Sequence, residues 1–309
     1  MTEFLIGTGG WAYFQVPKVH SLVAYSKAFN FVEVNSTFYE ILDLKRVGSW
    51  RRMVSSDFEF SVRCNKELTH NLRFQSVPDA YEILLTMVAI CRALKAELLH
   101  FQMPPSFQPK KSNGKIISNF FSTINLCEIR PVLEIRSQDP MDSSFIEVLR
   151  ELNIIHSVDL LKDELPAYNS DILYTRLFGK GFHNVYQPLD SELREVDRVA
   201  SQDNHKKAVI TMHSNRMFKD AARFLMYKET GDFPMVTTSI GVNSLVEVLK
   251  EDANFPSTKE QLIRHQGWKV IDLSKEERVR ASELLGKLPD KTYYDINEIF
   301  ESLEDVNFG

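Results

Sequence analysis

The chain of 309 residues can bury one large core, or one core and a small additional unit. Its content of 43% hydrophobic and 26% charged residues excludes a membrane protein, because no run of about 18 apolar residues occurs. The formal net charge of −5 excludes a general attraction to nucleic acid, so nucleic-acid binding would require a local basic patch.

The cysteines and the first residues predict the cellular compartment. Cys64, Cys91 and Cys127 are scattered and have no CxxC spacing, which is typical of reduced thiols rather than of a disulfide or zinc framework. Residues 1–10 lack the basic start and apolar core of a signal peptide. We therefore expect a cytoplasmic protein without a cofactor and without membrane contact. The oligomeric state is left open.

Short runs rich in β-branched and aromatic residues recur along the chain and predict eight strands. In chain order they cover residues 4–10, 31–36, 58–64, 97–103, 131–137, 154–160, 172–178 and 208–214. Segments with apolar residues at three- and four-residue spacing lie between them or follow the last one, which predicts helices. The clearest such segments cover residues 77–96, 141–153 and 216–227.

The alternation of strands and helices predicts the fold class. Strands alternating with helices form a parallel sheet, and eight units predict closure into a (β/α)8 TIM barrel of the α/β class. An open doubly wound sheet is the alternative, but no GxGxxG motif opens a helix. The glycines of "GTGG", residues 7–10, are followed by aromatic residues instead.

Polar residues alternate with aliphatic ones in the second predicted strand. Val32 and Val34 fit the outer face beneath the helices, so Glu33 and Asn35 should point into the barrel. The carboxyl ends of all barrel strands meet at one mouth, where active sites of this fold lie. Polar residues occur near the ends of six other runs: Arg63, Gln102, Glu134, Arg136, Asp159, Arg176, His213 and Asn215.

These residues predict a site, although a structural interpretation stays open. Glu33 could pair with Arg63, and Glu134 with Arg136, as buried ion pairs. Branched aliphatic residues usually fill a purely structural barrel centre, which favours a site. We predict Glu33, Glu134 and Asp159 as catalytic residues and no metal ligands. The predicted ligand-binding residues are Trp11, Asn35, Thr37, Tyr39, Arg63, His70, Gln102, Arg136, Arg176 and Asn215.

Several motifs, among them "IGTGGWAY", "VEVNSTFY", "FQMPPSF" and "YTRLFG", resemble the YecE-like family, also known as domain of unknown function 72, over residues 4 to about 230. The resemblance implies a TIM barrel whose activity is unestablished. It also implies comparison with xylose-isomerase-like and endonuclease IV-like barrels. The chain departs from the family pattern at Phe178 and Arg63, which replace a histidine and a lysine, and only Asn215 carries over from the motif of strand eight. These departures argue against a shared metal site.

Three functions fit these residues. An enzyme or binding protein for an anionic phosphate-bearing or sugar-like ligand would use Arg63, Arg136 and Arg176 on the anion and Glu33 or Glu134 for proton transfer. A metal-dependent phosphodiesterase is the second, but HxH, HExxH and DxD spacings do not occur. The third is non-catalytic binding of single-stranded nucleic acid at the mouth, with the arginines as phosphate contacts and four aromatic residues as stacking contacts: Trp11, Tyr13, Phe38 and Tyr39.

Residues 236–309 are predicted to form a small, mainly helical appendix to a barrel of residues 1–235. Ser257 or Thr258 can begin one helix, and Ser274 a second that continues through Leu285. "WKVIDL", residues 268–273, is a short strand or an extended connection, and Asp295 begins a last helix. The appendix fits an interaction module, a lid or a packing extension.

Overall fold

The computed structural model describes residues 2–202 and 205–304, and eight of its strands form one parallel sheet. Their order in the sheet is β6-β5-β4-β3-β2-β1-β8-β7, so consecutive strands lie side by side, and the first strand, β1, also pairs with the last, β8. The strands are β1 (Glu3–Thr8), β2 (Phe31–Val34), β3 (Glu59–Arg63), β4 (Leu98–Gln102), β5 (Arg130–Glu134), β6 (Ile155–Ser157), β7 (Ile172–Leu177) and β8 (Lys207–Met212).

The two edge strands meet and nearly close the sheet into a barrel. Val158, directly after β6, forms a parallel bridge to Thr175 of β7. The N–H of Arg176 donates to the carbonyl oxygen of Val158 at 2.9 Å. The predicted (β/α)8 barrel is therefore confirmed, and the alternative of an open doubly wound sheet is wrong.

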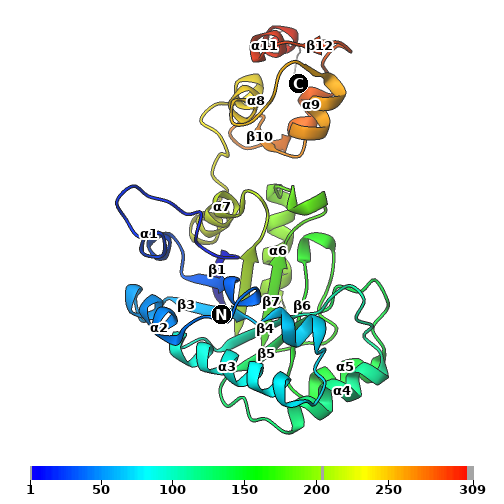
Figure 1. The fold of residues 1–309 in the computed structure, drawn as a ribbon. Helices are drawn as coiled ribbons and strands as arrows, with labels where there is room; N and C mark the ends of the chain where they lie inside the picture. The colour runs from blue at the N-terminus through cyan, green and yellow to red at the C-terminus, as the bar shows by residue number, and fades with distance from the viewer. Residues whose placement is uncertain (1, 203–204, 305–309) are drawn as a thin grey trace. The chain divides into compact units, whose positions relative to one another are not determined.

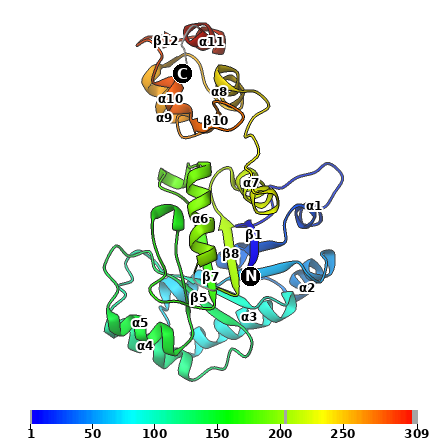
Figure 2. The same ribbon diagram turned by 180° about the vertical axis from the view of Figure 1, so that it is seen from behind.

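Helices follow the strands and cover the outside of the barrel, as α2 to α5 show in both views (Figures 1 and 2). The predicted helices at residues 77–96, 141–153 and 216–227 are confirmed with slightly different ends, as α3, α5 and α7. The helices up to residue 230 are α1 (Ser21–Ala28), α2 (Leu44–Met53), α3 (Pro78–Leu94), α4 (Lys111–Ser122), α5 (Ser143–Glu151), α6 (Asp190–Gln202) and α7 (Met217–Thr230).

The interior of the barrel has an apolar layer and a polar layer. The apolar layer is one buried cluster: Leu5, Phe31, Leu98, Val132, Ile155, Tyr174 and Val209. Because side chains on one face of a strand recur every two residues, the next inward positions lie two residues further toward the carboxyl ends. Those positions hold polar side chains, such as Glu33 after Phe31 and Glu134 after Val132. The alternation of each strand thus carries the polar layer to the mouth.

The backbone contacts divide the chain into two compact units. The first contains residues 1–177 and 198–213, and the second contains residues 178–197 and 214–309. The predicted boundary between residues 235 and 236 stays a prediction, and the observed grouping differs from it. The segment between β7 and β8 contributes its first part, residues 178–197, to the second unit.

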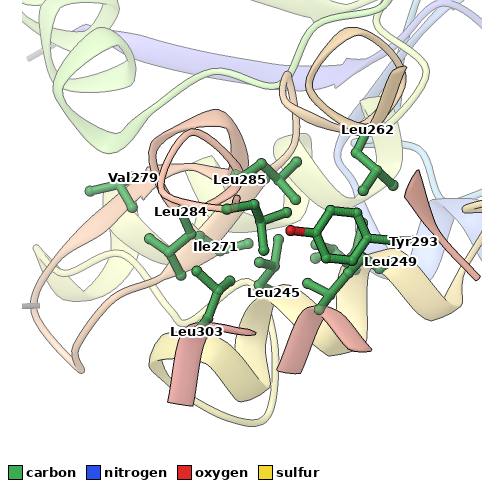
Figure 3. Packing of buried hydrophobic residues seen from close by; sticks show 13 residues of the cluster. Leu245, Leu249, Leu262, Ile271, Val279, Leu284, Leu285, Tyr293 and Leu303 are labelled. Atoms are coloured by element: carbon green, nitrogen blue, oxygen red, sulfur yellow. The ribbon is translucent and has the colours of Figure 1, made fainter. Parts of the chain in front are cut away.

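The C-terminal part of the second unit has its own hydrophobic core (Figure 3). Leu245, Leu249, Leu284 and Tyr293 are among its buried members. The elements are α8 (Gly241–Lys250), β9 (Ser257–Thr258), α9 (Lys259–Gln266), β10 (Val270–Asp272), β11 (Arg278–Arg280), α10 (Ala281–Leu285), β12 (Thr292–Tyr293) and α11 (Ile296–Glu304).

One predicted helix of this part is wrong over its first seven residues. Ser274 does not begin a helix, because residues 274–277 turn and β11 pairs antiparallel with β10. Val279 of β11 is buried in the core, which favours the strand over a longer helix. The caps at the other two helices are confirmed. Thr258 caps α9 with its hydroxyl, and Asp295 accepts hydrogen bonds from the first N–H groups of α11.

A chain of ion pairs joins the two segments of the second unit. Arg278 contacts Asp272 at 3.1 Å and Asp190 at 3.2 Å, and Asp190 also pairs with Arg223. Nearby, the side chain of Gln187 accepts the N–H of Val270 at 2.9 Å. Residues 178–197 therefore depend on partners about 80 to 90 positions later in the sequence.

Across residues 2–202 and 205–304, the structure contains no helix with the length and apolar character needed to cross a membrane. The longest helix is α3, Pro78–Leu94, and it covers the barrel strands. The cytoplasmic location stays a prediction.

Candidate ligand-binding site at the carboxyl ends of the barrel strands

A buried arginine connects two carboxylates in the polar layer of the barrel. Arg176 of β7 contacts Glu33 of β2 at 2.9 Å and also pairs with Glu134 of β5. Its Nη1 donates to Gln102 Oε1 at 3.0 Å. Arg176 is 2% exposed and Glu33 is fully buried, so this pair lies below the surface of the mouth. The sequence predicted all four residues for the site, but neither of the two proposed pairings joined Glu33 or Glu134 to Arg176.

Two residues that the sequence analysis missed complete this network. The hydroxyl of Tyr174 donates to Glu33 Oε2 at 2.8 Å, and Ser61 lies 2.8 Å from the same hydroxyl. Tyr174 precedes Arg176 by two residues and therefore shares its inward face. That alternation was the signal that would have found it. The same alternation marks Ser61, which precedes Arg63 by two residues in β3.

Arg63 at the end of β3 carries a charge that no carboxylate contacts among the described residues. Its guanidinium donates to Gln102 Oε1 at 2.7 Å and to Asn35 Oδ1 at 3.2 Å, and both acceptors are neutral amides. The group lies over the ring of Phe38, 3.6 Å from its centroid. Burial and the charge of Arg176 lower the pKa of Arg63 to about 10, so Arg63 stays cationic at neutral pH. The predicted pair of Glu33 with Arg63 is not formed.

The two carboxylates are ionised despite their burial. Burial raises the pKa of Glu33 and of Glu134, but the neighbouring groups, Arg176 first among them, together outweigh it and hold each pKa below its ordinary range. Arg136 pairs with Glu134, which confirms the second of the two proposed ion pairs. Both carboxylates are therefore committed to arginines and are weak proton acceptors.

Two histidines line the network as neutral groups. His100 Nε2 lies 3.2 Å from Glu134 Oε2, and His213 Nε2 lies 3.5 Å from Glu33 Oε1. Burial and the charge of Arg176 lower the pKa of both imidazoles. Gly9 lies against His213 so closely that an added Cβ would be 2.3 Å from its Cε1. This contact places the first predicted motif next to the polar layer.

His70 lies in the π-helix η2 (Glu67–Asn71), which follows β3. Its ring packs edge-on against Phe38 at 5.3 Å, and its Nδ1 lies 2.9 Å from the hydroxyl of Thr69. Burial lowers the pKa of His70, and four cations lower it further: Arg63, Arg136, Arg73 and Lys66. The surroundings of His70 are therefore strongly positive.

The side chains of Asn35 and Thr37 form hydrogen bonds to backbone carbonyl groups around the site. The amide of Asn35 donates to Gly9 O at 2.9 Å while its oxygen accepts from Arg63. Thr37 is buried, and its hydroxyl lies 2.6 Å from the carbonyl oxygen of Arg63. These contacts join the carboxyl ends of β2 and β3, so the two residues position Arg63.

The predicted aromatic residues separate into packed and exposed ones. Trp11 packs edge-on against Trp50 of α2, with 4.9 Å between the ring centroids. Tyr39 is 68% exposed and lies edge-on to Phe38 at 5.1 Å. Tyr39 is thus available for a ligand next to Arg63, whereas one edge of Trp11 already contacts α2.

The described contacts of Asp159 and Asn215 are with other parts of the chain. Asp159 caps the short helix η3 (Leu160–Lys162), where it accepts the N–H of Leu161 at 3.1 Å. Asn215 belongs to the second unit and lines a cavity of about 330 Å³ there with Arg216 and Trp268. Neither residue contributes to the cluster of Glu33, Glu134 and Arg176 in the described contacts.

The described residues contain no group of three or more histidine, cysteine, aspartate or glutamate side chains placed to hold a metal ion. The donor set of the polar layer explains this arrangement. Arginines occupy oxygen atoms of Glu33 and Glu134 that a cation would otherwise use.

Comparison with known proteins defines the family. The UPF0759 protein YunF of Bacillus subtilis (strain 168) is 31% identical over 121 residues, which are 35% of this chain and 42% of that protein. The chain thus matches less than half of the length of this relative. Crystal structures of DUF72 family proteins from Enterococcus faecalis V583 and Thermotoga maritima MSB8 have the same fold. Their TM-scores are 0.58 and 0.56.

The structural match covers most of both chains. The Enterococcus faecalis protein is 16% identical, and the alignment covers 75% of this chain and 99% of that one. The Thermotoga maritima protein is 18% identical, with 74% and 99% covered. The sequence pattern described as "Protein of unknown function DUF72" matches residues 5–229. This chain, with its barrel and its arginine-linked carboxylates, belongs to the DUF72 family.

Proposed function

We propose that the protein binds an anionic, phosphate-bearing ligand at the carboxyl ends of the barrel strands, with Arg63 as the principal contact. The observation that supports this proposal is the charge of Arg63. It is held in place by two amides and an aromatic ring, and no carboxylate contacts it among the described residues.

The balance of charge at the mouth favours an anion over a neutral ligand. Glu33 and Glu134 contact Arg176, and Glu134 also contacts Arg136, whereas Arg63 adds a third guanidinium. A guanidinium has five N–H donors in a planar fork that fits a phosphate group, and Arg63 uses two of them on amide oxygens. A neutral sugar would leave this charge uncompensated.

Binding is better supported than turnover by the predicted carboxylates. A general base needs a pKa near the working pH and a free oxygen. Glu33 is fully buried, and its two oxygens accept from Arg176 and Tyr174. Glu134 is 8% exposed and pairs with two arginines. We therefore assign Glu33 and Glu134 the role of holding Arg176, and an enzymatic role of this mouth would fall to a neutral histidine such as His70.

Titration calorimetry with inorganic phosphate tests the proposal. We expect the wild-type protein to bind phosphate and Arg63→Gln to bind at least about tenfold more weakly, because one charge-assisted contact is lost. Arg51→Gln is the matched control, since Arg51 of α2 also lies over an aromatic ring, Phe60, at 5.2 Å. Failure of the wild-type protein to bind, or equal binding by Arg63→Gln, would refute the proposal.

Single-stranded nucleic acid is a second candidate, which the exposed ring of Tyr39 favours. Tyr39 contacts Phe38, and Phe38 lies beneath Arg63, so a stacking surface adjoins a phosphate contact. Binding of a short oligonucleotide should then weaken steeply with salt, and Tyr39→Ala should weaken it further. Binding of phosphate alone, with no oligonucleotide affinity, would eliminate this candidate.

A further inference from the structure

The segment that follows β3 contains two successive residues in the left-handed region of backbone conformation. Arg73 has a φ of 48° and Phe74 a φ of 59°. This conformation costs free energy for a residue with a Cβ atom, and such residues cluster at functional sites. A second successive pair, His183 and Asn184, occurs elsewhere in the chain. The π-helix η2 lies directly before Arg73 and Phe74, and helices of this kind also concentrate at functional sites.

The burial of Phe74 stabilises this left-handed backbone conformation. Its side chain is fully buried, and its ring lies 5.4 Å from the ring of Phe101 in β4. It lies equally close to Phe120 of α4 and 5.6 Å from Phe121. Burial of a whole phenylalanine side chain outweighs a left-handed backbone at one or two positions. The aromatic cluster therefore fixes where Arg73 must lie.

Arg73 is exposed and contacts only neutral acceptors among the described residues. Its Nε donates to the carbonyl oxygen of His70 at 3.2 Å, and its Nη2 donates to the hydroxyl of Ser106 at 3.1 Å. Ser106 follows Pro104 and Pro105 in the loop after β4, at the carboxyl side of the barrel. The charge of Arg73 is thus held on this side without a carboxylate.

We propose that residues 66–74 form the outer half of the anion site, in which Arg73 and Lys66 bind the exposed part of a ligand that carries two or more negative charges. Arg63 takes the inner part, and His70 lies between the two halves. The ligand class is then a diphosphate, a bisphosphate or a phosphodiester chain rather than a single small anion. This inference rests on the proposed function and extends it to the number of charges recognised.

The positive potential around His70 supports this assignment. Four cations, Arg63, Arg73, Arg136 and Lys66, act on the imidazole from three places in the chain: β3, the segment after it, and the segment after β5. Phe38 and Thr69 are the other described neighbours of the ring, and neither carries a charge. An anion above His70 would meet the field of all four cations together.

A purely structural role for Arg73 makes a different prediction. If its two hydrogen bonds serve only to fix the loop, replacing it should reduce stability and leave anion binding unchanged. If the strained position exists for binding, Arg73→Gly should relieve the backbone and reduce affinity at the same time. Only if the strained position exists for binding does Arg73→Gly raise stability and lower anion affinity.

The experiment compares inorganic phosphate with pyrophosphate in calorimetry and follows the melting temperature. We expect the wild-type protein to bind pyrophosphate at least about tenfold more tightly than phosphate, and Arg73→Gly to lose most of this preference while its Tm rises by about 2 °C. Arg73→Gln keeps the backbone strain, so it should lose the preference without the rise in Tm. Lys95→Gly is the matched control, because Lys95 is an exposed cation with a φ of 57° at the end of α3, away from this segment.

The outcomes separate the inference from the proposed function. If the wild-type protein binds neither anion, the proposed function fails. If it binds both and Arg63→Gln weakens both, but Arg73→Gly and Arg73→Gln keep the wild-type preference, the proposed function stands and the inference is overturned. A loss of preference in Lys95→Gly as large as in Arg73→Gly would also overturn it, since the effect would then not be specific to this segment.

Discussion

Replacing Arg176 by methionine tests whether one guanidinium holds the polar layer together. The substitution removes contacts to Glu33, Glu134 and Gln102 and keeps most of the side-chain volume. The centres of an ion pair in contact lie about 4 Å apart, which corresponds to about 4 kcal/mol for each pair at an effective dielectric constant of about 20. The two pairs together contribute about 8 kcal/mol before solvation is counted.

Part of this energy is offset because the variant no longer buries a guanidinium. Removing one partner of a buried pair typically costs about 3–5 kcal/mol after this correction, so we expect a loss of about 4 kcal/mol at pH 7 and a Tm lower by about 10 °C. Urea unfolding measures it. Tryptophan fluorescence in a Trp268→Phe background reports on the barrel, since Trp11 and Trp50 both belong to the first unit.

The pH dependence gives the sharper criterion. In the wild-type protein the pKa values of Glu33 and Glu134 are lowered, so their contribution is present above the unfolded pKa of 4.5 and is lost as the pH falls. Without Arg176, burial is opposed only by the remaining groups, such as Arg136 at Glu134, so both pKa values move upward and the variant loses more stability than the wild-type protein as the pH rises. The difference between the two proteins should therefore be largest at pH 7 and shrink towards pH 5. A loss below about 1 kcal/mol, or one that does not change with pH, would refute this account.

Three further predictions concern other parts of the chain. His156→Asn should flatten the acid limb of the stability curve. Burial lowers the pKa of His156 from 6.5 to about 4, so about 3 kcal/mol of stability present above pH 6.5 is lost as the pH falls to 4. Urea unfolding between pH 7 and 4 measures the stability of both proteins, and parallel stability curves for the wild-type protein and the variant would contradict this prediction. Gly9→Ala should lower the free energy of unfolding by about 1–3 kcal/mol in thermal melting, because its Cβ would clash with His213. Gly48→Ala in α2 makes no close contact and should raise the free energy of unfolding by up to about 1 kcal/mol. Equal effects of the two substitutions would show that the clash is absent. Leu284→Ala should lower the free energy of unfolding of the second unit by about 2–5 kcal/mol. The fluorescence of Trp268 measures this change in a background where phenylalanine replaces the other two tryptophans. A change smaller than about 1 kcal/mol would show that the core of Figure 3 does not determine the stability of that unit.

The barrel was predictable because its signal repeats. The period of two in "FVEVN" separates Val32 and Val34 from Glu33, and the same period recurs in β5 and β7. Eight such repeats average out local ambiguity. The appendix has only short elements with no repetition, so its sequence pattern predicts a helix from Ser274 although Val279 is in a strand.

The pairing within the site could not be predicted from the same pattern. Alternation shows that Glu33, Glu134 and Arg176 point inward, but the distance between strands two, five and seven depends on how the barrel closes. Of the two ion pairs that the sequence suggests, Arg136 with Glu134 is formed, whereas Glu33 contacts Arg176 and not Arg63. The left-handed conformation of Arg73 is set by the burial of Phe74, a tertiary effect that no local propensity carries.

The discontinuous second unit has a consequence for synthesis on the ribosome. Gln187 and Asp190 leave the ribosome before β8 does, yet their partners Val270 and Arg278 are made 83 and 88 residues later. At about 5–20 residues per second, the segment 178–197 waits roughly 4 to 18 seconds for those partners. The last barrel strand becomes available during this interval. All eight barrel strands can therefore leave the ribosome before Gln187 and Asp190 meet these two partners.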